Sequence, residues 1–224
     1  MSEILILNGS GRGKKSTSAG LGIYLIDLLK EESIAATMLT IRNQLNSEEK
    51  IKEMVDAISE ATHIIVIAPL YDDCQPYNVV KAQEIIAESK MNLENKHFLF
   101  IANSGFGEPE QITEGTLRIY KKFASSVGFR WGGSLSIGGG EMLQGRYGKL
   151  LHEVGTFAKN AIVELEKIVN SIKSESTYPD TEIILIPGFF YKWPFKQLFT
   201  SMNTRGWKKV AAKNGEKVDA KPFL

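Results

Sequence analysis

The chain of 224 residues is poor in the side chains that build cross-links and metal centres. It has a single cysteine, Cys74, and only three histidines. One thiol cannot form an internal disulfide, and it cannot hold an iron–sulfur cluster, which needs several cysteines. His63, His97 and His152 are far apart in the sequence and show no metal-ligand spacing. The sequence therefore excludes a disulfide scaffold, and we expect no metal site.

Two further features are absent: an excess of charge of one sign and a long apolar run. Lysine and arginine number 27 against 26 acidic residues, a net charge of +1, which gives no reason to expect nucleic-acid binding. No apolar run approaches the roughly 18 residues of a membrane span, and no signal-peptide pattern precedes the first apolar strand. With 43% hydrophobic and 24% charged residues, the composition is that of a globular protein, and we expect it in the cytoplasm.

What the chain does contain is an alternation of apolar runs and amphipathic segments. The apolar runs predict five strands, at 3–8, 36–41, 63–68, 97–102 and 129–137. The amphipathic segments predict five helices, at 16–32, 47–61, 77–89, 111–127 and 147–172, with Ser18 as a capping residue of the first. Such alternation predicts an α/β fold, a parallel sheet with helices on both faces. We place a domain boundary at 172/173, before a polar linker.

The first strand runs into a loop rich in glycine, serine and cations, NGSGRGKKSTS. A nucleoside-triphosphate loop does not fit, because its first glycine would fall on Asn8 and its hydroxyl residue on Lys15. A dinucleotide fingerprint does not fit either, because Lys14 stands at its third glycine. The remaining interpretation is a loop that closes around one terminal phosphate at a helix N-terminus. Its hydroxyls and charges come from Ser10, Ser16, Thr17, Ser18, Arg12, Lys14 and Lys15.

Two more unusual loops follow later strands, at the carboxyl edge where open α/β sheets bind their ligands. After the third strand come Pro69, Leu70 and Tyr71, and Tyr71 offers an aromatic face. After the fourth come Asn103, Ser104, Gly105 and Phe106, which present backbone and side-chain polar groups beside an apolar ring. Together with the phosphate loop, this pattern indicates a flat, amphipathic heterocycle that carries a phosphate.

The stretches ILILNGSGRGKKSTSAG, IAPLYDDCQPYNVVKAQEIIA, FIANSGFGEPEQ and GFRWGGSLSIGGGEML together resemble the flavodoxin-like NAD(P)H-dependent FMN reductases and quinone reductases. The resemblance covers residues 1–172. It implies a three-layer sandwich with strand order 2-1-3-4-5, FMN as cofactor, NADH or NADPH as donor, and a homodimer. The FMN contacts that it implies are Ser10, Arg12, Ser16, Thr17 and Ser18 for the phosphate, and Pro69, Leu70, Tyr71, Asp72, Asn103, Ser104, Gly105 and Phe106 for the ring.

We therefore expect an FMN-dependent oxidoreductase that passes electrons from NADH or NADPH to a quinone, a nitro or azo compound, or free flavin. Because the cofactor carries such chemistry, no catalytic side chain is expected. The alternative is a flavodoxin-type electron carrier without a substrate of its own. Carriers of this type tend to be small and strongly acidic, so the net charge of +1 and the C-terminal extension argue against it.

The predicted extension, residues 173–224, is aromatic and then basic. Six aromatic residues lie between Phe189 and Phe199, and the tail that follows holds Arg205, Lys208, Lys209, Lys213, Lys217 and Lys221 against Glu216 and Asp219. Such a segment either docks on protein or lies on a membrane surface. We favour docking across a homodimer, because Pro187, Gly188 and Pro194 would interrupt an interfacial helix and the family resemblance implies dimers.

Overall fold

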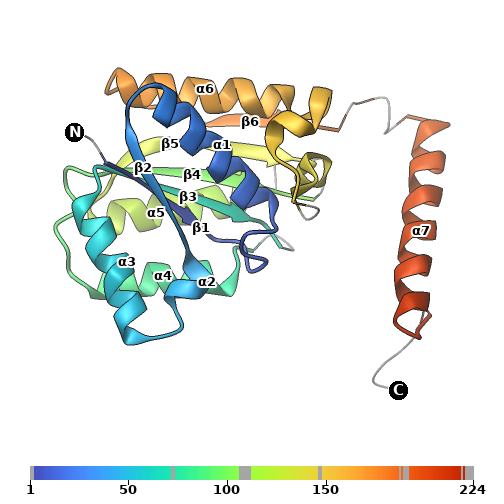
Figure 1. Ribbon diagram of the computed structural model, residues 1–224, viewed down its shortest axis with the longest axis horizontal. Coiled ribbons are helices and arrows are strands. Elements are labelled where there is room, and N and C mark those ends of the chain that lie inside the picture. Colours follow the sequence, from blue (N-terminus) through green and yellow to red (C-terminus); the bar gives the residue numbers. More distant parts are fainter. Residues whose placement is uncertain are drawn as a thin grey trace. The chain divides into compact units, whose positions relative to one another are not determined.

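The computed structural model describes residues 3–71, 74–105, 112–145, 148–186, 188, 192–217 and 219. The chain forms two compact units, Met1–Leu185 and Ile186–Leu224 (Figure 1). The first unit holds the sheet and six α-helices, and the second holds the helix α7 (Phe195–Lys213). None of the described helices is both long enough and apolar enough to cross a bilayer.

The first unit is built on one six-stranded sheet in the order β2-β1-β3-β4-β5-β6, with every pair of neighbours parallel. Ile6 in β1 pairs with Met38 in β2 and with Ile65 in β3, so β1 lies inside the sheet. The strands are β1 (Glu3–Asn8), β2 (Ala35–Thr40), β3 (His63–Pro69), β4 (His97–Asn103), β5 (Arg130–Gly138) and β6 (Thr181–Ile184). The α/β prediction and the order 2-1-3-4-5 of the first five strands are confirmed.

The prediction of five strands is wrong, because β6 adds a sixth strand where the predicted polar linker (173–182) passes into the apolar run IILIP. This strand is only four residues long and partly exposed, so its hydrophobic pattern is weak. Side-chain contacts just before it hold it in place. Asp180 Oδ1 accepts hydrogen bonds from Trp131 Nε1 at 3.0 Å and Ser134 Oγ at 2.8 Å. Buried Tyr178 donates from its backbone to Gly132 O at 3.0 Å.

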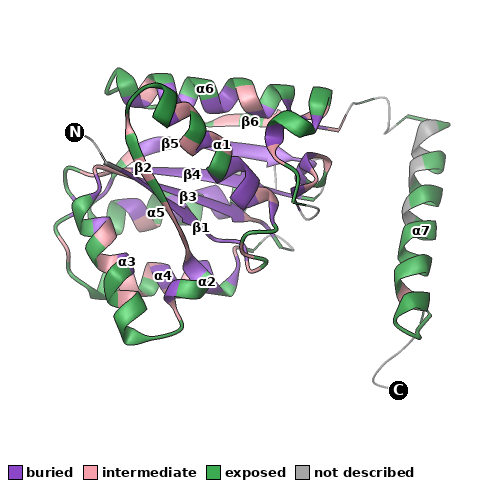
Figure 2. Cartoon of the chain, viewed as in Figure 1, coloured by how far each residue is buried: buried purple, intermediate pink, exposed green. Residues whose placement is uncertain are grey.

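Helices cover both faces of the sheet, and the four central strands β1, β3, β4 and β5 are mostly buried, whereas the edge strands β2 and β6 are partly exposed (Figure 2). One apolar core lies between the sheet and the pair α1 and α6, and the other between the sheet and the group α3, α4 and α5. These helices are α1 (Thr17–Glu31), α3 (Glu48–Glu60), α4 (Tyr77–Glu88), α5 (Leu117–Val127) and α6 (Lys159–Lys173); the short α2 (Ile41–Gln44) follows β2.

Two helix starts differ from the prediction. The N-cap of α1 is Ser16, whose Oγ accepts from Ala19 N at 3.1 Å, and not Ser18, which is buried inside the first turn. The helix predicted at 147–172 corresponds to α6, which begins at Lys159 and not at residue 147. Gly148 and Gly155 have φ values of +75° and +72°, a left-handed conformation that an α-helix cannot contain. The apolar spacing before Lys159 therefore belongs to short 3-10 turns.

A stacked histidine pair lies at the amino end of the sheet, where β3 and β4 begin. The rings of His63 and His97 are 4.7 Å apart. Burial, and then the charge of His97, lower the pKa of His63 to about 4. Burial, and then the charge of Arg130, lower the pKa of His97. The folded protein therefore disfavours protonation of both rings.

We expect this pair to destabilise the fold as the pH falls from about 6.5 to about 4. In that range the unfolded histidines take up protons that the folded ones do not, so the free energy of unfolding falls. The contribution is on the order of 1 kcal/mol, since solvent screens a partly exposed ring. Urea unfolding at pH 7 and pH 4.5 tests it. His63→Gln should reduce the pH dependence, whereas the same change at exposed His152 should not. If the free energy of unfolding depends equally on pH in both variants, the pH dependence does not come from His63.

Candidate functional site

The candidate site lies at the carboxyl edge of the sheet, where β1, β3 and β4 end in the loops singled out by the sequence and where the glycine-rich loop after β5 also lies. The first of these loops is organised by Asn8, the fully buried last residue of β1. Its Oδ1 accepts from Ser10 N at 3.0 Å, and its Nδ2 donates to Gly13 O at 3.2 Å. One side chain thus fixes both ends of the turn Ser10–Gly13. Gly13 has φ +63°, a conformation that side chains disfavour.

Two further buried asparagines tie this loop to its neighbours. Asn78, in the first turn of α4, donates from Nδ2 to Gly9 O at 3.0 Å. Asn103, at the end of β4, donates from Nδ2 to Ser18 Oγ at 3.0 Å and to Ala68 O at 3.2 Å. Three amide side chains therefore hold the loops after β1, β3 and β4 in one arrangement.

The first turn of α1 presents backbone N–H groups at this edge. Ser16 caps Ala19 N and also donates from Oγ to Gly13 O at 2.7 Å. Thr17 and Ser18 are the first two helical residues, so their N–H groups have no acceptor within the helix. The positive end of the helix dipole lies at the same place. The local charge and the donors therefore suit an anion.

The loop after β5 forms a wall beside this turn. A Cβ on Gly145 would lie only 2.3 Å from Thr17 N, so no larger residue fits without a shift. Thr17 Oγ1 also donates to Gly140 O, at 3.3 Å. The Gly140–Gly145 segment therefore borders the candidate site and contacts the first turn of α1 directly.

Cations surround the loop on its solvent side. Arg12, Lys14 and Lys15 are exposed. Arg12 pairs loosely with Glu141, with an Nη1–Oε1 distance of 3.7 Å. Arg42, at the start of α2, donates from Nη1 to Gly11 O at 2.6 Å. The Arg12 guanidinium is thus held only by a loose ion pair, whereas the Arg42 guanidinium is fixed by a hydrogen bond to the loop.

The loops that were predicted to hold the ring are described in part. Leu70 is buried and donates from its N–H to Asn103 O at 2.9 Å. Tyr71 is 46% exposed and exchanges two backbone hydrogen bonds with Cys74. Ser104 is buried, its N–H donates to Ile137 O at 2.9 Å, and its carbonyl accepts from Gly140 N at 2.6 Å. Tyr71 is therefore the side chain of this group that faces solvent as a free aromatic surface.

Eleven of the thirteen predicted contact residues lie on these adjoining segments. Pro69 pairs with Asn103 in the register of β3 and β4, and Gly105 is exposed beside Ser104. Asn103 Nδ2 donates a hydrogen bond to Ser18 Oγ, so these two atoms hold the loops together. Asp72 and Phe106 lie outside the described residues.

Sequence analysis missed four residues that shape the site: Asn8, Asn78, Arg42 and Gly145. Asn8 was weighed only as a mismatch to a glycine, although a polar residue at the end of a buried strand is itself a signal. The roles of Asn78, Arg42 and Gly145 depend on contacts between segments 31 to 128 residues apart along the chain. Local patterns do not reveal such contacts.

We expect Asn103→Ala to lower the free energy of unfolding by about 1–2 kcal/mol, because the buried Ala68 carbonyl then loses a donor. Chemical denaturation measures this effect. The matched control is Asn170→Ala on the exposed side of α6, which should change stability by less than about 0.5 kcal/mol. Equal effects of the two substitutions would contradict the framework role of Asn103.

Among the described residues, no group of three or more histidine, cysteine or acidic side chains is placed to hold a metal ion. The donors that converge at the carboxyl edge are N–H groups, hydroxyls and cations, and these suit an anionic ligand.

No protein-family model and no curated protein matches the chain. Solved structures do. A flavodoxin from Streptococcus pneumonia TIGR4 aligns with a TM-score of 0.54 and 14% identity, over 78% of this chain and 99% of its own. An NADH:FMN oxidoreductase in its apo form aligns with a TM-score of 0.55 and 18% identity, over 84% of this chain and 97% of its own. An NAD(P)H:quinone oxidoreductase from Methanothermobacter marburgensis aligns with 0.55 and 12%, over 77% and 97%. The flavodoxin-like fold is therefore confirmed, with β6 as an addition.

Proposed function

We propose that the chain is an FMN-dependent oxidoreductase that takes electrons from NADH or NADPH and reduces a small acceptor: a quinone, a nitro or azo compound, or free flavin. The observation that carries this proposal is the loop Gly9–Ser16, ordered by Asn8 and placed at the N-terminus of α1. Flavodoxin-like folds bind their ligand at this carboxyl edge.

The residues present fit the phosphate of such a cofactor. Open space surrounds Gly11 and Gly13, where an added Cβ would meet nothing within 4 Å. The amides of Thr17 and Ser18 lack intrahelical acceptors, and Arg12 and two lysines lie on the same loop. A dianion placed here gains charge-assisted hydrogen bonds from backbone and side chain together. The loop holds no equivalent provision for an adenylate, and so we propose FMN and not FAD.

The neighbouring loops fit a flat ring. Tyr71 is 46% exposed and supplies an aromatic side chain. The loop after β4, with exposed Gly105, adjoins the loop after β3, because Leu70 N donates to Asn103 O at 2.9 Å. When bound, FMN would supply the redox chemistry, accepting a hydride equivalent from the nicotinamide donor and releasing electrons to the acceptor. The chain's own residues bind and orient: Arg12 and the α1 amides hold the phosphate, while Leu70 and Asn103 fix the loops against each other.

The structural neighbours support an oxidoreductase but also include a flavodoxin. One observation favours this second candidate, an electron carrier. Residues 186–224 hold eight of the 27 basic residues and two of the 26 acidic ones. The first unit therefore carries a net charge of −5, and the whole-chain value of +1 hides an acidic domain.

Anaerobic reduction separates the two candidates. The purified protein is loaded with FMN, its flavin is extracted and identified by mass, and NADH or NADPH is added without oxygen. An oxidoreductase should bleach the flavin absorbance within the time of a turnover assay and pass electrons to a quinone. A carrier should bind FMN and stay oxidised until a separate reductase is added. Absence of any flavin affinity would overturn both candidates.

A homodimer is a separate proposal, taken from the family resemblance. Light scattering of the FMN-loaded protein tests it, and a mass near the 24.9 kDa of one chain would contradict it.

A further inference from the structure

The C-terminal unit differs from the first unit in charge. Residues 186–224 carry a net charge of +6 against −5 for residues 1–185. Helix α7 contains five of the cations and no acidic residue at all. Its cations are Lys196, Arg205, Lys208, Lys209 and Lys213. The excess of positive charge favours binding of α7 to an anionic surface.

The described residues of helix α7 are mostly exposed (Figure 2), and four of them are large and apolar. Leu198, Met202 and Val210 are 60%, 61% and 57% exposed, and Trp207 is 69% exposed. At about 100° of turn per residue, Leu198, Met202 and Val210 lie within about 120° of one another around α7. Lys209 and Lys213 lie on the same side, so this apolar side also carries cations. Trp207 lies about 60° beyond Val210, at the edge of this side.

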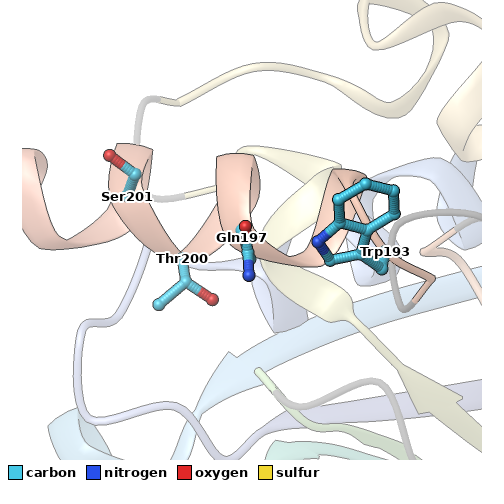
Figure 3. A pocket seen from close by; sticks show the side chains of 4 residues that line it. All are labelled: Trp193, Gln197, Thr200 and Ser201. Carbon is cyan, nitrogen blue, oxygen red and sulfur yellow. The ribbon is translucent and has the colours of Figure 1, made fainter.

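Another side of the chain here is lined by Trp193, just before α7, and by Gln197, Thr200 and Ser201 on α7, which border a pocket (Figure 3). The three polar side chains are uncharged, but Lys208 lies on the same side of the helix. The helix therefore combines exposed apolar side chains with cations on all of its sides. Clustered cations of this kind favour an anionic lipid surface.

We propose that α7 binds the surface of an anionic lipid bilayer, with its apolar side in the headgroup region and its cations on the phosphates. The aromatic residues stay at the boundary, where an apolar ring and a polar group are both accommodated. The cations gain from the negative surface potential. The helix lies on the membrane and does not span it. This inference concerns residues 186–224 and does not depend on the proposed flavin chemistry.

The structure removes one of our two reasons for favouring docking on protein, and the dimer implied by the family resemblance remains the other. We expected Pro187, Gly188 and Pro194 to interrupt an interfacial helix. Pro194 instead occupies the N-cap, and α7 then runs for 19 residues without a break. Proline is tolerated at the start of a helix because the first N–H groups have no intrahelical acceptor.

The first unit offers no obvious counterpart for the apolar side of α7 among its described residues. Its exposed large apolar side chains are scattered among separate elements. Ile23 on α1 and Val163 on α6 belong to one layer, and Tyr77 on α4 and Ile119 on α5 belong to the other. Two more lie elsewhere, Tyr71 after β3 and Ile184 on the edge strand β6. Apolar residues exposed singly are normal on a protein surface. A second copy of this domain would therefore meet the charge of α7 but not its apolar stripe.

Attachment by α7 would keep the first unit within reach of the membrane. Because β6 is parallel to β5, the chain leaves the sheet at the carboxyl edge, where Leu185 N donates to Gly138 O at 2.9 Å. Only nine residues, 186–194, separate this point from α7, a reach of at most about 30 Å. An acceptor dissolved in the bilayer would then lie close to the domain.

Vesicle sedimentation with the full chain tests the proposal. Vesicles of phosphatidylcholine alone are compared with vesicles containing 30% phosphatidylglycerol (about the anionic fraction that produces a strong surface potential), at low and high salt. The protein should pellet with the anionic vesicles only, less so at high salt. Tryptophan emission should shift to the blue on vesicle addition, because Trp207, at the edge of the apolar side, leaves water.

Two pairs of substitutions separate apolar from electrostatic binding. Leu198→Glu with Met202→Glu, and Lys208→Glu with Lys209→Glu, should each weaken anionic-vesicle binding by at least about tenfold. The matched control reverses two exposed charges of the first unit, Lys122→Glu with Lys159→Glu, and should weaken binding by less than about threefold, since these charges lie outside α7.

Solution mass decides between membrane and protein docking. Without lipid, light scattering should give the same mass for the wild type and for Leu198→Glu with Met202→Glu. A lower mass in that variant, together with no pelleting of the wild type on either vesicle, would overturn the proposal in favour of docking between copies. Equal pelleting of the wild type and both α7 variants would overturn it as well, because α7 would then not be the attachment.

Discussion

Gly133→Ala should destabilise the domain by about 3–5 kcal/mol, which combines backbone strain with overpacking against a rigid neighbour. Gly133 has φ +110°, a conformation that residues with a Cβ rarely adopt. An added Cβ would lie only 1.9 Å from Tyr178 O and 2.7 Å from Tyr178 C. Because the atoms in the way are backbone, no rotation of a side chain relieves the contact.

The contact is large in effect because Tyr178 anchors the segment that leads to β6. The Tyr178 hydroxyl donates to buried Glu164 Oε2 at 2.7 Å, and its N–H donates to Gly132 O at 3.0 Å. Burial raises the pKa of Tyr178 and keeps the hydroxyl protonated as this donor. Pushing the Tyr178 backbone away therefore strains both hydrogen bonds and the β5–β6 pairing.

Urea unfolding measured by circular dichroism gives the change in free energy. Gly155→Ala is the matched control: Gly155 also has a positive φ, +72°, but an added Cβ would meet nothing within 4 Å. The control should cost about 1–2 kcal/mol, the strain of the left-handed conformation alone. If the two variants lose the same stability, the close approach of Tyr178 does not matter and the role given to Gly133 is wrong.

The sequence was sufficient for most of the fold because the buried strands carry continuous apolar runs. HIIVIA and HFLFIA contain few residues that suit anything but the interior of a parallel sheet, and the structure places them in β3 and β4. β6 was missed for the opposite reason. This edge strand has only four residues, TEII, and begins with two polar ones that continue the polar linker. The contacts that hold it, from Trp131, Ser134 and Lys121 to Asp180, come from distant segments.

The candidate site was predicted in its location but not in its mechanics. Strand ends and glycine-rich loops placed it at the carboxyl edge, because in a parallel sheet all carboxyl ends meet there. Patterns could not show that the amide of Asn103 is used between Ser18 and Ala68. The charge argument had a related weakness. A net charge for the whole chain averages an acidic domain with a basic helix, and only the division into two units separates them.

Arg12→Ala should weaken FMN binding by about 1.5–3 kcal/mol, roughly 10- to 150-fold in Kd, if this guanidinium bonds the phosphate. The Arg12 side chain is 53% exposed and makes one loose ion pair, with Glu141 at 3.7 Å. Its removal should therefore leave the fold intact. Arg42, which donates to Gly11 O, keeps the loop in place.

Flavin fluorescence quenching measures the Kd, and two controls isolate the phosphate. Riboflavin lacks the phosphate, so Arg12→Ala should leave its affinity unchanged. Arg118→Ala removes an exposed arginine from α5, outside the phosphate loop, and should leave both affinities unchanged. Glu141→Gln should tighten FMN binding a few fold, because it removes a carboxylate that competes with the phosphate for Arg12. Equal losses for FMN and riboflavin in Arg12→Ala would instead assign Arg12 to the ring or to the shape of the loop, and the phosphate would have to bind elsewhere.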